Sequence, residues 1–294
     1  AQTRMGGKGG YGKVQTDNLT VGLFQHDTNR NQEPNLHFHA VVANVTQGND
    51  GKWRALRNDK LWSLNTLLNS MTMARFRMAV ETMGYAAGPV GKHGNFEAAG
   101  IGREQIMAFS SRREEVLDAV RQLGENSPKA RDIAVLDTRK SKAPAMDRQG
   151  LLEGWQQSAG EVGLDLQAMI EASHMRAAAA ANTSSKEGSF IQRGMTKLKE
   201  FAQRIKGDPA DPLIPAHVLK QDAPTIAAAQ AVASAVRHLS QREAAFPRDG
   251  LLKAALDFGL PTTVDRVERQ VNALVRTGAL VRGKGAHSGW LASK

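Results

Sequence analysis

Residues 24–46 read FQHDTNRNQEPNLHFHAVVANVT, and this stretch decides how the first part of the chain is expected to fold. Two runs rich in strand-forming residues, LTVGLFQ and LHFHAVVANV, flank the turn-forming segment HDTNRNQEPN. Such a pattern is typical of a β-hairpin, and we expect Asp27, Thr28 and Asn29 to cap its turn.

Three of the chain's 8 histidines fall within this hairpin. Alternate side chains of a strand lie on one face, so His37 and His39 should project together, with His26 on the paired strand. Cross-strand neighbours lie about 5 Å apart at Cβ, which lets three imidazoles converge on one divalent ion. Open coordination positions would then serve metal-assisted phosphoryl or hydrolytic chemistry. The alternative is that the histidines simply lie on a polar face, but the spacing favours the metal site.

The composition limits the class of protein. A chain of 294 residues has room for one large domain or two modest ones, and its net charge of +10 favours a polyanionic partner such as nucleic acid. The absence of cysteine excludes disulfides and thiolate zinc sites. No segment reads as a membrane span or a signal peptide, so we expect a cytoplasmic protein without membrane insertion. The chain lacks an initiator methionine, and we expect it to be cut from a longer protein.

The pattern beyond the hairpin predicts an α/β (α+β) domain, in which helices flank an antiparallel sheet. A turn (48–52) and a short strand, KWRAL (52–56), should follow, and a Gly-punctuated hairpin is expected at 85–101. Helices are expected at 61–83, 103–123, roughly 128–138, 147–158 and about 164–180.

A second domain is expected at the C-terminal end. Residues 177–224 begin with an Ala/Ser/Thr-rich stretch and read as a linker after a first domain at 1–176. From residue 225 the segments TIAAAQAVASAVRHLS, PRDGLLKAALDFG and TVDRVERQVNALVRTG predict three amphipathic helices. The final ALVRGKGAHSGWLA reads as strand, basic turn and strand. Residues 225–294 therefore predict a small winged-helix-like domain.

The histidine segment resembles the three-histidine metal motif of conjugative relaxases of the TraI/TrwC (MobF) type, which belong to the HUH nucleases. VGKHGNFEAAGI (90–101), FSSRREEV (109–116) and RDIAVLDTRKSK (131–142) resemble later blocks of these relaxases, in the same order. The resemblance covers roughly residues 12–176. Residues 225–294 are similar to the region that follows the relaxase domain, where a helicase or helicase-derived part begins.

The resemblance implies a DNA-nicking mechanism. A tyrosine hydroxyl attacks one phosphodiester of single-stranded DNA at a plasmid origin of transfer, giving a 5′-phosphotyrosine link and a free 3′-OH. A divalent metal, Mg²⁺ or Mn²⁺, would be held by His26, His37 and His39 and would stabilise charge on the scissile phosphate. Other relaxosome and type IV secretion components are implied as partners.

The sequence departs from the family at the nucleophile. In these relaxases the catalytic tyrosines lie near the extreme N-terminus, as does an acidic residue that orients the metal-binding histidines. Neither Tyr11 nor Tyr85 matches that position, so we expect no catalytic residue in this chain. The alternative function is a non-catalytic DNA-binding or regulatory remnant that works through the winged helix.

Basic residues in the matching blocks are the expected DNA contacts, through backbone phosphates. They are Lys92, Arg131, Arg139, Lys140 and Lys142, of which the last three stand in DTRKSK, a block that resembles the DNA-covering lid of the relaxases. In the terminal domain, Arg266, Arg269 and Arg276 recur near helical spacing. They would be the basic residues of a recognition helix if the winged helix binds DNA. The alternative is that the winged helix is a scaffold.

Overall fold

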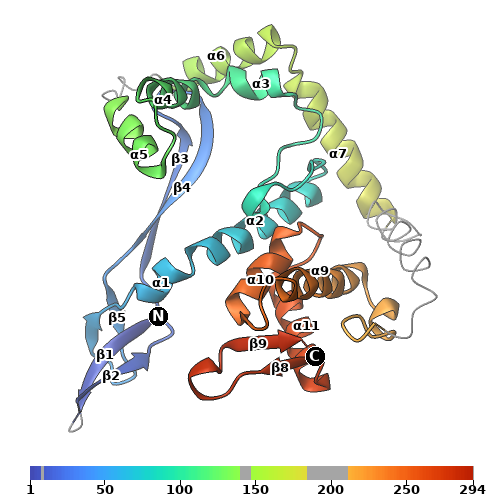
Figure 1. Cartoon of the computed structure of the whole chain (residues 1–294). Coiled ribbons are helices and arrows are strands. Elements are labelled where there is room, and N and C mark those ends of the chain that lie inside the picture. The colour runs from blue at the N-terminus through green and yellow to red at the C-terminus, as the bar shows by residue number, and fades with distance from the viewer. Residues whose placement is uncertain (8–9, 140–146, 184–210, 294) are drawn as a thin grey trace. The chain divides into compact units, whose positions relative to one another are not determined.

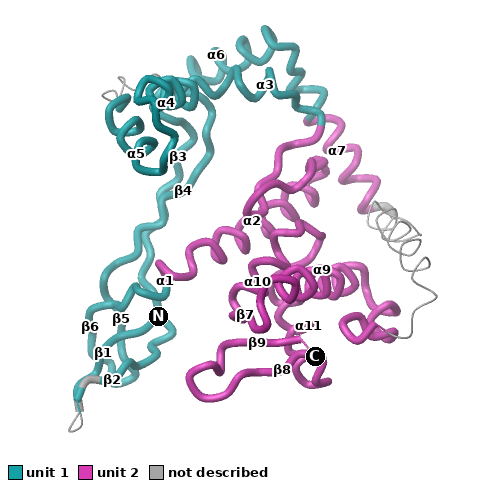
Figure 2. Tube along the Cα trace, in the orientation of Figure 1, with its two compact units in different colours: residues 1–60, 100–169 teal, residues 61–99, 170–294 magenta. Residues whose placement is uncertain are grey.

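The computed structural model describes residues 1–7, 10–139, 147–183 and 211–293 (Figure 1). The chain forms two compact units, one of residues 1–60 with 100–169 and the other of residues 61–99 with 170–294 (Figure 2). Lys140, Lys142 and most of the expected linker lie outside the described residues. The helices that the structure describes include none long and apolar enough to cross a membrane.

The strands of the first unit form three antiparallel pairs. They are β1 (Gln2–Gly7) with β2 (Gly10–Gln15), β3 (Val21–Thr28) with β4 (Pro34–Val42), and β5 (Val45–Gln47) with β6 (Trp53–Ala55). The hairpin predicted from the histidine segment is therefore confirmed as β3–β4. Buried threonines join the other two pairs, because the Thr16 and Thr46 hydroxyls lie 2.6 Å apart and the Thr3 hydroxyl donates to the Ala55 carbonyl oxygen.

Helices follow the strands in the first unit. They are α3 (Arg103–Ala108), α4 (Ser111–Gln122), α5 (Pro128–Asp137) and α6 (Arg148–Glu161). Side-chain caps fix two helix starts: the Ser127 hydroxyl accepts from the Ala130 amide, and the Asp147 carboxylate accepts from the Gly150 amide. The continuous helix predicted at 103–123 is wrong, because the chain breaks between α3 and α4.

The N-terminal part of the second unit is helical. The predicted helix at 61–83 is two elements, α1 (Asp59–Ser63) and α2 (Asn65–Thr82), with a break at Leu64. Gly84 then ends α2 with a φ of +89°. The Gly-punctuated hairpin is confirmed by a bridge between Ala87 and Ala98, with the short helix η1 (Lys92–Gly94) at its tip. Helix α7 (Leu166–Thr183) follows α6 in the chain.

The C-terminal part of the second unit has winged-helix topology. Helix α9 (Ala223–Ser240), strand β7 (Phe246–Pro247), helices α10 (Arg248–Asp257) and α11 (Val264–Thr277), and strands β8 (Leu280–Arg282) and β9 (Trp290–Ser293) follow in order. The sheet order is β7-β9-β8. Val232, Leu251, Val267, Val271 and Leu274 are among its buried core residues. The three helices and β-wing expected from the sequence are confirmed.

Candidate metal centre

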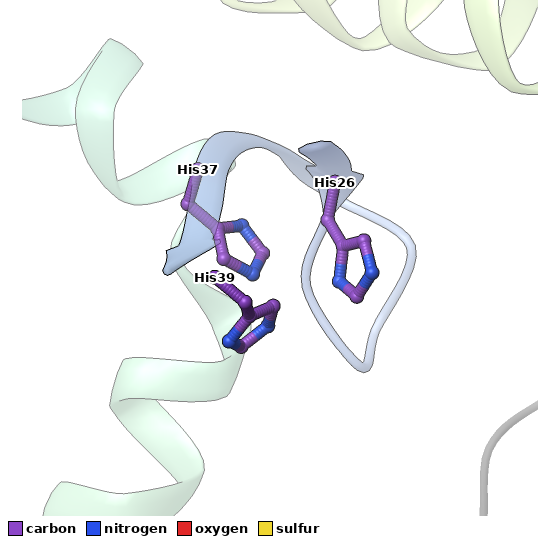
Figure 3. Close-up of side chains that lie close together, drawn as sticks. All are labelled: His26, His37 and His39. Atoms are coloured by element: carbon purple, nitrogen blue, oxygen red, sulfur yellow. The ribbon is translucent and has the colours of Figure 1, made fainter. Parts of the chain in front are cut away.

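The register of the β3–β4 hairpin places three histidines on one face. His26 lies directly opposite His37, and Phe24 lies opposite His39. Because His37 and His39 are two residues apart on β4, their side chains leave the same face as His26. The convergence predicted from the sequence is therefore confirmed (Figure 3).

The three imidazole rings are close enough to share one ion. Their ring centroids lie 4.7 Å apart for His26 and His39, 5.0 Å for His37 and His39, and 5.3 Å for His26 and His37. One nitrogen from each ring lies within 4.8 Å of the others. His26 and His39 are exposed and His37 is half-buried, so the site opens to solvent.

A hydrogen bond within β4 fixes the tautomer of His37. Its Nδ1 lies 2.8 Å from the carbonyl oxygen of Asn35. A carbonyl oxygen only accepts, so Nδ1 must carry the proton and donate it. The lone pair of Nε2 is then free to bind a metal, which is the usual arrangement of a metal-binding histidine. The register of the hairpin shifts between His26 and Thr28, next to this site, and such irregularities are common beside functional sites.

The turn of the hairpin is held by its own side chains. The Oδ1 of Asn29 accepts from the backbone amides of Asn31 and Glu33, at 2.9 and 3.1 Å. Asn29 thus caps the turn as expected. Asp27 does not, because its carboxylate pairs with the guanidinium of Arg148 at the start of α6.

Two helices of the same unit anchor this turn. The Glu33 carboxylate accepts from the Ser111 amide, in the first turn of α4, at 2.7 Å. The indole Nε1 of Trp155 in α6 donates to the Gln32 carbonyl oxygen at 2.8 Å. These contacts fix the turn end of the β3–β4 hairpin, which carries the histidines.

The hydrogen bonds to Glu33 also set its ionisation. Partial burial disfavours the charged carboxylate, but hydrogen bonds from Ser111 and Asn29 outweigh that effect and lower the pKa of Glu33 below its ordinary value. The carboxylate is therefore charged at neutral pH, at the N-terminal end of α4, where a helix favours an anion.

The donor set fits a divalent metal. Three imidazoles from a rigid strand pair supply three nitrogen ligands, and the exposed side of the site leaves positions for water or a phosphate oxygen. Among the described residues, this is the group of His, Asp and Glu side chains close enough to hold a metal ion.

The basic residues predicted to bind DNA are spread over both units of the chain. Arg131 lies in α5, where its Nε donates to Asn126 at 2.9 Å, and Arg139 follows the end of α5. Lys92 lies in η1 of the other unit. Lys140 and Lys142 lie outside the described residues. Sequence reasoning missed Arg148, because its pairing with the neighbour of His26 crosses 121 positions and has no local signal.

The arrangement of the three histidines and the mixed fold agree with a comparison against protein families. The TrwC relaxase family model matches residues 1–162, more than half of the chain. The chain belongs to the TrwC relaxase family. The resemblance drawn from the histidine segment and the later blocks is therefore confirmed.

Curated relatives of this TrwC-family chain are much longer. The multifunctional conjugation protein TraI of Escherichia coli is 40% identical over 210 residues, which are 67% of this chain and 12% of the relative. TraI of Escherichia coli strain K12 matches to the same extent. The chain thus corresponds to a small part of these proteins.

Solved structures of TrwC itself share the fold. Metal-free and metal-bound structures of the conjugative relaxase TrwC with OriT DNA are 35% identical, with a TM-score of 0.53 over 56% of this chain. The alignments cover 59% and 57% of those chains, respectively. A copper-bound TrwC structure with OriT DNA matches equally well.

Proposed function

We propose that this chain is the metal-binding part of a conjugative relaxase, which binds single-stranded DNA at a plasmid origin of transfer for site- and strand-specific nicking. The observation that carries the proposal is the convergence of His26, His37 and His39, with Nε2 of His37 left free by the bond to Asn35. Membership of the TrwC relaxase family and the OriT complexes of TrwC support it.

The histidines would hold a divalent metal against the scissile phosphate. Such an ion supplies Lewis-acid stabilisation of the negative charge that develops on the phosphate oxygens. The chain's own task is to hold three imidazoles so that one nitrogen of each is aimed at one point. The Asn35 carbonyl does this for His37, and the anchored turn holds the ladder that carries all three. Attack on the phosphorus would come from a tyrosine hydroxyl, and we assign that step to no residue of this chain.

We propose Mg²⁺ or Mn²⁺ as the working ion. Imidazole nitrogens bind Cu²⁺, Ni²⁺ and Zn²⁺ more tightly than either, so the choice in a cell would follow metal availability rather than affinity. An open site with three protein ligands keeps room for a phosphate oxygen whichever of these ions is bound.

Basic side chains would hold the DNA backbone. We propose that DNA binding and nicking take place in the cytoplasm. Arg131, Arg139, Lys140, Lys142 and Lys92 are proposed as phosphate contacts, because cations that neutralise phosphates supply most of the sequence-independent affinity. Relaxosome proteins and type IV secretion components are the proposed protein partners.

Metal binding by the 294-residue chain tests the first half of the proposal. We expect His37→Ala and His39→Ala each to weaken Mn²⁺ binding, measured by calorimetry, by more than about tenfold, because even groups beyond the ligand set are worth that much. His174→Ala, which removes an exposed histidine of α7, is the matched control and should bind normally. Equal affinity in all three variants would contradict the metal site.

Nicking tests the second half. A relaxase that includes this segment and a tyrosine nucleophile should cleave an origin-of-transfer oligonucleotide, and His37→Ala or His39→Ala should slow that cleavage. Undiminished nicking in these variants, with the control also active, would rule out the catalytic role of the metal.

A further inference from the structure

The outward face of helix α11 is polar and basic. Its exposed side chains include Asp265, Arg269, Asn272 and Arg276, which recur at helical spacing on one face. The opposite face carries buried valines and Leu274 and packs into the core of the winged helix. Helix α11 thus has a face that the winged helix does not use for its own packing.

The cations of this face are not neutralised by neighbouring acids. Residues 269–294 contain no Asp or Glu, and their basic residues are Arg269, Arg276, Arg282, Lys284 and Lys294. Within the described part of the chain, none of the first four forms an ion pair, whereas other cations of the domain do: Arg237 pairs with Asp211 and Arg248 with Glu268. The acids of the domain therefore leave this face positively charged.

Two charged residues at the start of α11 form ion pairs, unlike Arg269 and Arg276. Arg266, expected to act with Arg269 and Arg276 if the winged helix binds DNA, donates to the carboxylate of Asp222 at 2.7 Å, so we leave it out of this face. Asp265 lies 3.9 Å from the guanidinium of Arg75, which offsets the acid at this end of the face.

The wing beside α11 is an ordered, basic loop. Residues 283–289 join β8 to β9 and carry Lys284, and the Gly283 amide donates to the Trp290 carbonyl oxygen at 3.0 Å. The base of the loop is tied to α10 by the Arg248 amide, which donates to the Gly289 carbonyl oxygen at 2.9 Å. The rings of His287 and Trp290 meet edge to face, with centroids 6.3 Å apart. These contacts pre-organise the wing, so a ligand that binds it has less ordering to impose.

We propose that α11 and the wing form a binding surface for double-stranded DNA, separate from the histidine site. Arg269 and Arg276 are seven residues apart, or about 10 Å along the helix axis at the usual rise. An α-helix with its side chains is about 10–12 Å across and fits a major groove about 12 Å wide, so both arginines would lie along one groove. Arginine and asparagine are side chains that read base edges and contact phosphates there, and the wing cations would contact the flanking backbone.

The chemistry of this face favours a duplex over a single strand. Single-strand binding relies on aromatic side chains on which successive bases stack. The sequence of α11, VDRVERQVNALVRT, has no aromatic residue. Trp290, the first residue of β9, is 40% exposed and its ring meets that of His287 edge to face. One aromatic side chain does not supply a series of stacking positions for successive bases. A rigid helix that projects two arginines and an asparagine is the geometry of groove recognition.

The double variant Arg269→Ala/Arg276→Ala tests the surface in the whole 294-residue chain. The matched control is Lys220→Ala/Arg242→Ala, which removes two exposed cations outside α11 and the wing and leaves the same net charge. The probe is a blunt DNA duplex of about 20 base pairs, roughly two helical turns, of arbitrary sequence. Binding is measured by fluorescence anisotropy over a range of salt concentrations with EDTA present, so that no metal bound by the histidines contributes.

We expect the α11 variant to bind the duplex about tenfold more weakly than the control. The plot of log affinity against log salt concentration should be less steep for this variant, by roughly two units of slope. Its affinity for one strand of the same duplex should match that of the control. An equal loss in both variants would show general electrostatics and overturn the proposal. A loss confined to the single strand, or an unchanged duplex affinity, would overturn it as well. Matching thermal unfolding of the two variants confirms that both are folded.

Discussion

His37 donates its Nδ1 proton to the carbonyl oxygen of Asn35, two residues earlier on the same strand. The bond selects one tautomer before any metal binds, and it points Nε2 toward the rings of His26 and His39 on the same face of the hairpin. A ligand that is already oriented loses less conformational entropy on binding. The strand itself therefore supplies part of the metal site.

The metal-free protein should carry that tautomer in solution. In a nitrogen-15 NMR spectrum recorded where the imidazoles are neutral, we expect Nδ1 of His37 to show the shift of a protonated nitrogen and Nε2 that of an unprotonated one. His174, an exposed residue of α7, serves as the reference, with the mixture of tautomers typical of an exposed imidazole. The opposite pattern at His37 would mean that the Asn35 bond does not orient the ring.

The turn cap should control the order of the hairpin end. Asn29→Ala removes the acceptor that serves two backbone amides, those of Asn31 and Glu33, and the loss should cost about 1 kcal/mol or more. We expect these two amides to exchange hydrogen roughly tenfold faster, which is the kinetic equivalent of that free energy. Asn95→Ala, at an exposed asparagine of the other unit, is the control and should leave both amides protected.

The anchor between Glu33 and α4 should weaken in acid. The pKa of Glu33 is lower in the folded protein than in the unfolded chain, where the ordinary value is about 4.3. A lowered pKa means that the contact contributes its full stability above that ordinary value and loses it as the pH falls through the folded pKa. Neutral pH is therefore the condition in which the turn is held most firmly.

Glu33→Gln isolates this contribution. The amide keeps a hydrogen-bond acceptor but not the charge, so the variant should melt about 2–4 °C below the parent chain near pH 6. The difference should shrink as the pH falls through the lowered pKa of Glu33. Glu97→Gln, at an exposed carboxylate of the other unit, controls for the change in net charge and should track the parent throughout this pH range. A gap between Glu33→Gln and the parent that persists undiminished in acid would show that the charge is not what matters.

The histidine site could be predicted from the sequence because its geometry is local. Two histidines one residue apart on a strand must share a face, and the turn residues between the two runs fix which strands pair. The contacts that hold the turn could not be predicted in this way. Glu33 meets Ser111 across 78 positions and Asp27 meets Arg148 across 121, and no spacing rule joins residues so far apart.

Some helix boundaries also had a local signal in the sequence, and others did not. The break between α3 and α4 had a local signal, because Ser110 and Ser111 are of a type that favours helix starts, and Ser110 is the N-cap of α4. Ser110 reinforces the break by donating its hydroxyl proton to the Ile106 carbonyl oxygen at 2.7 Å. The break at Leu64 had no such signal, because no Gly or Pro lies nearby. Leu64 instead packs against the core of the second unit. Tertiary packing overrides helix propensity at that point.

Gly84 should be intolerant of a side chain for two separate reasons. Its φ of +89° is a conformation that L residues rarely adopt. A Cβ at this position would also lie 2.0 Å from the carbonyl oxygen of Ser173 in α7, so the backbone there would have to move. The Gly84 carbonyl oxygen in turn accepts from Nε of Arg176 at 2.6 Å, which makes this the point where the end of α2 is fixed to α7.

Gly84→Ala and Gly163→Ala together separate the two effects. Gly163 also has a positive φ, of +65°, but a Cβ there would meet nothing within 4 Å, so its alanine variant should lose only about 1–2 kcal/mol from backbone strain. Gly84→Ala carries the same strain and a clash with backbone, and we expect it to lose at least about 3 kcal/mol. Urea unfolding followed by circular dichroism, with hydrogen exchange at Tyr85 and Arg176 as a local readout, measures the difference. Equal losses in the two variants would mean that α7 yields at Ser173 without cost and that the contact between α2 and α7 is not rigid.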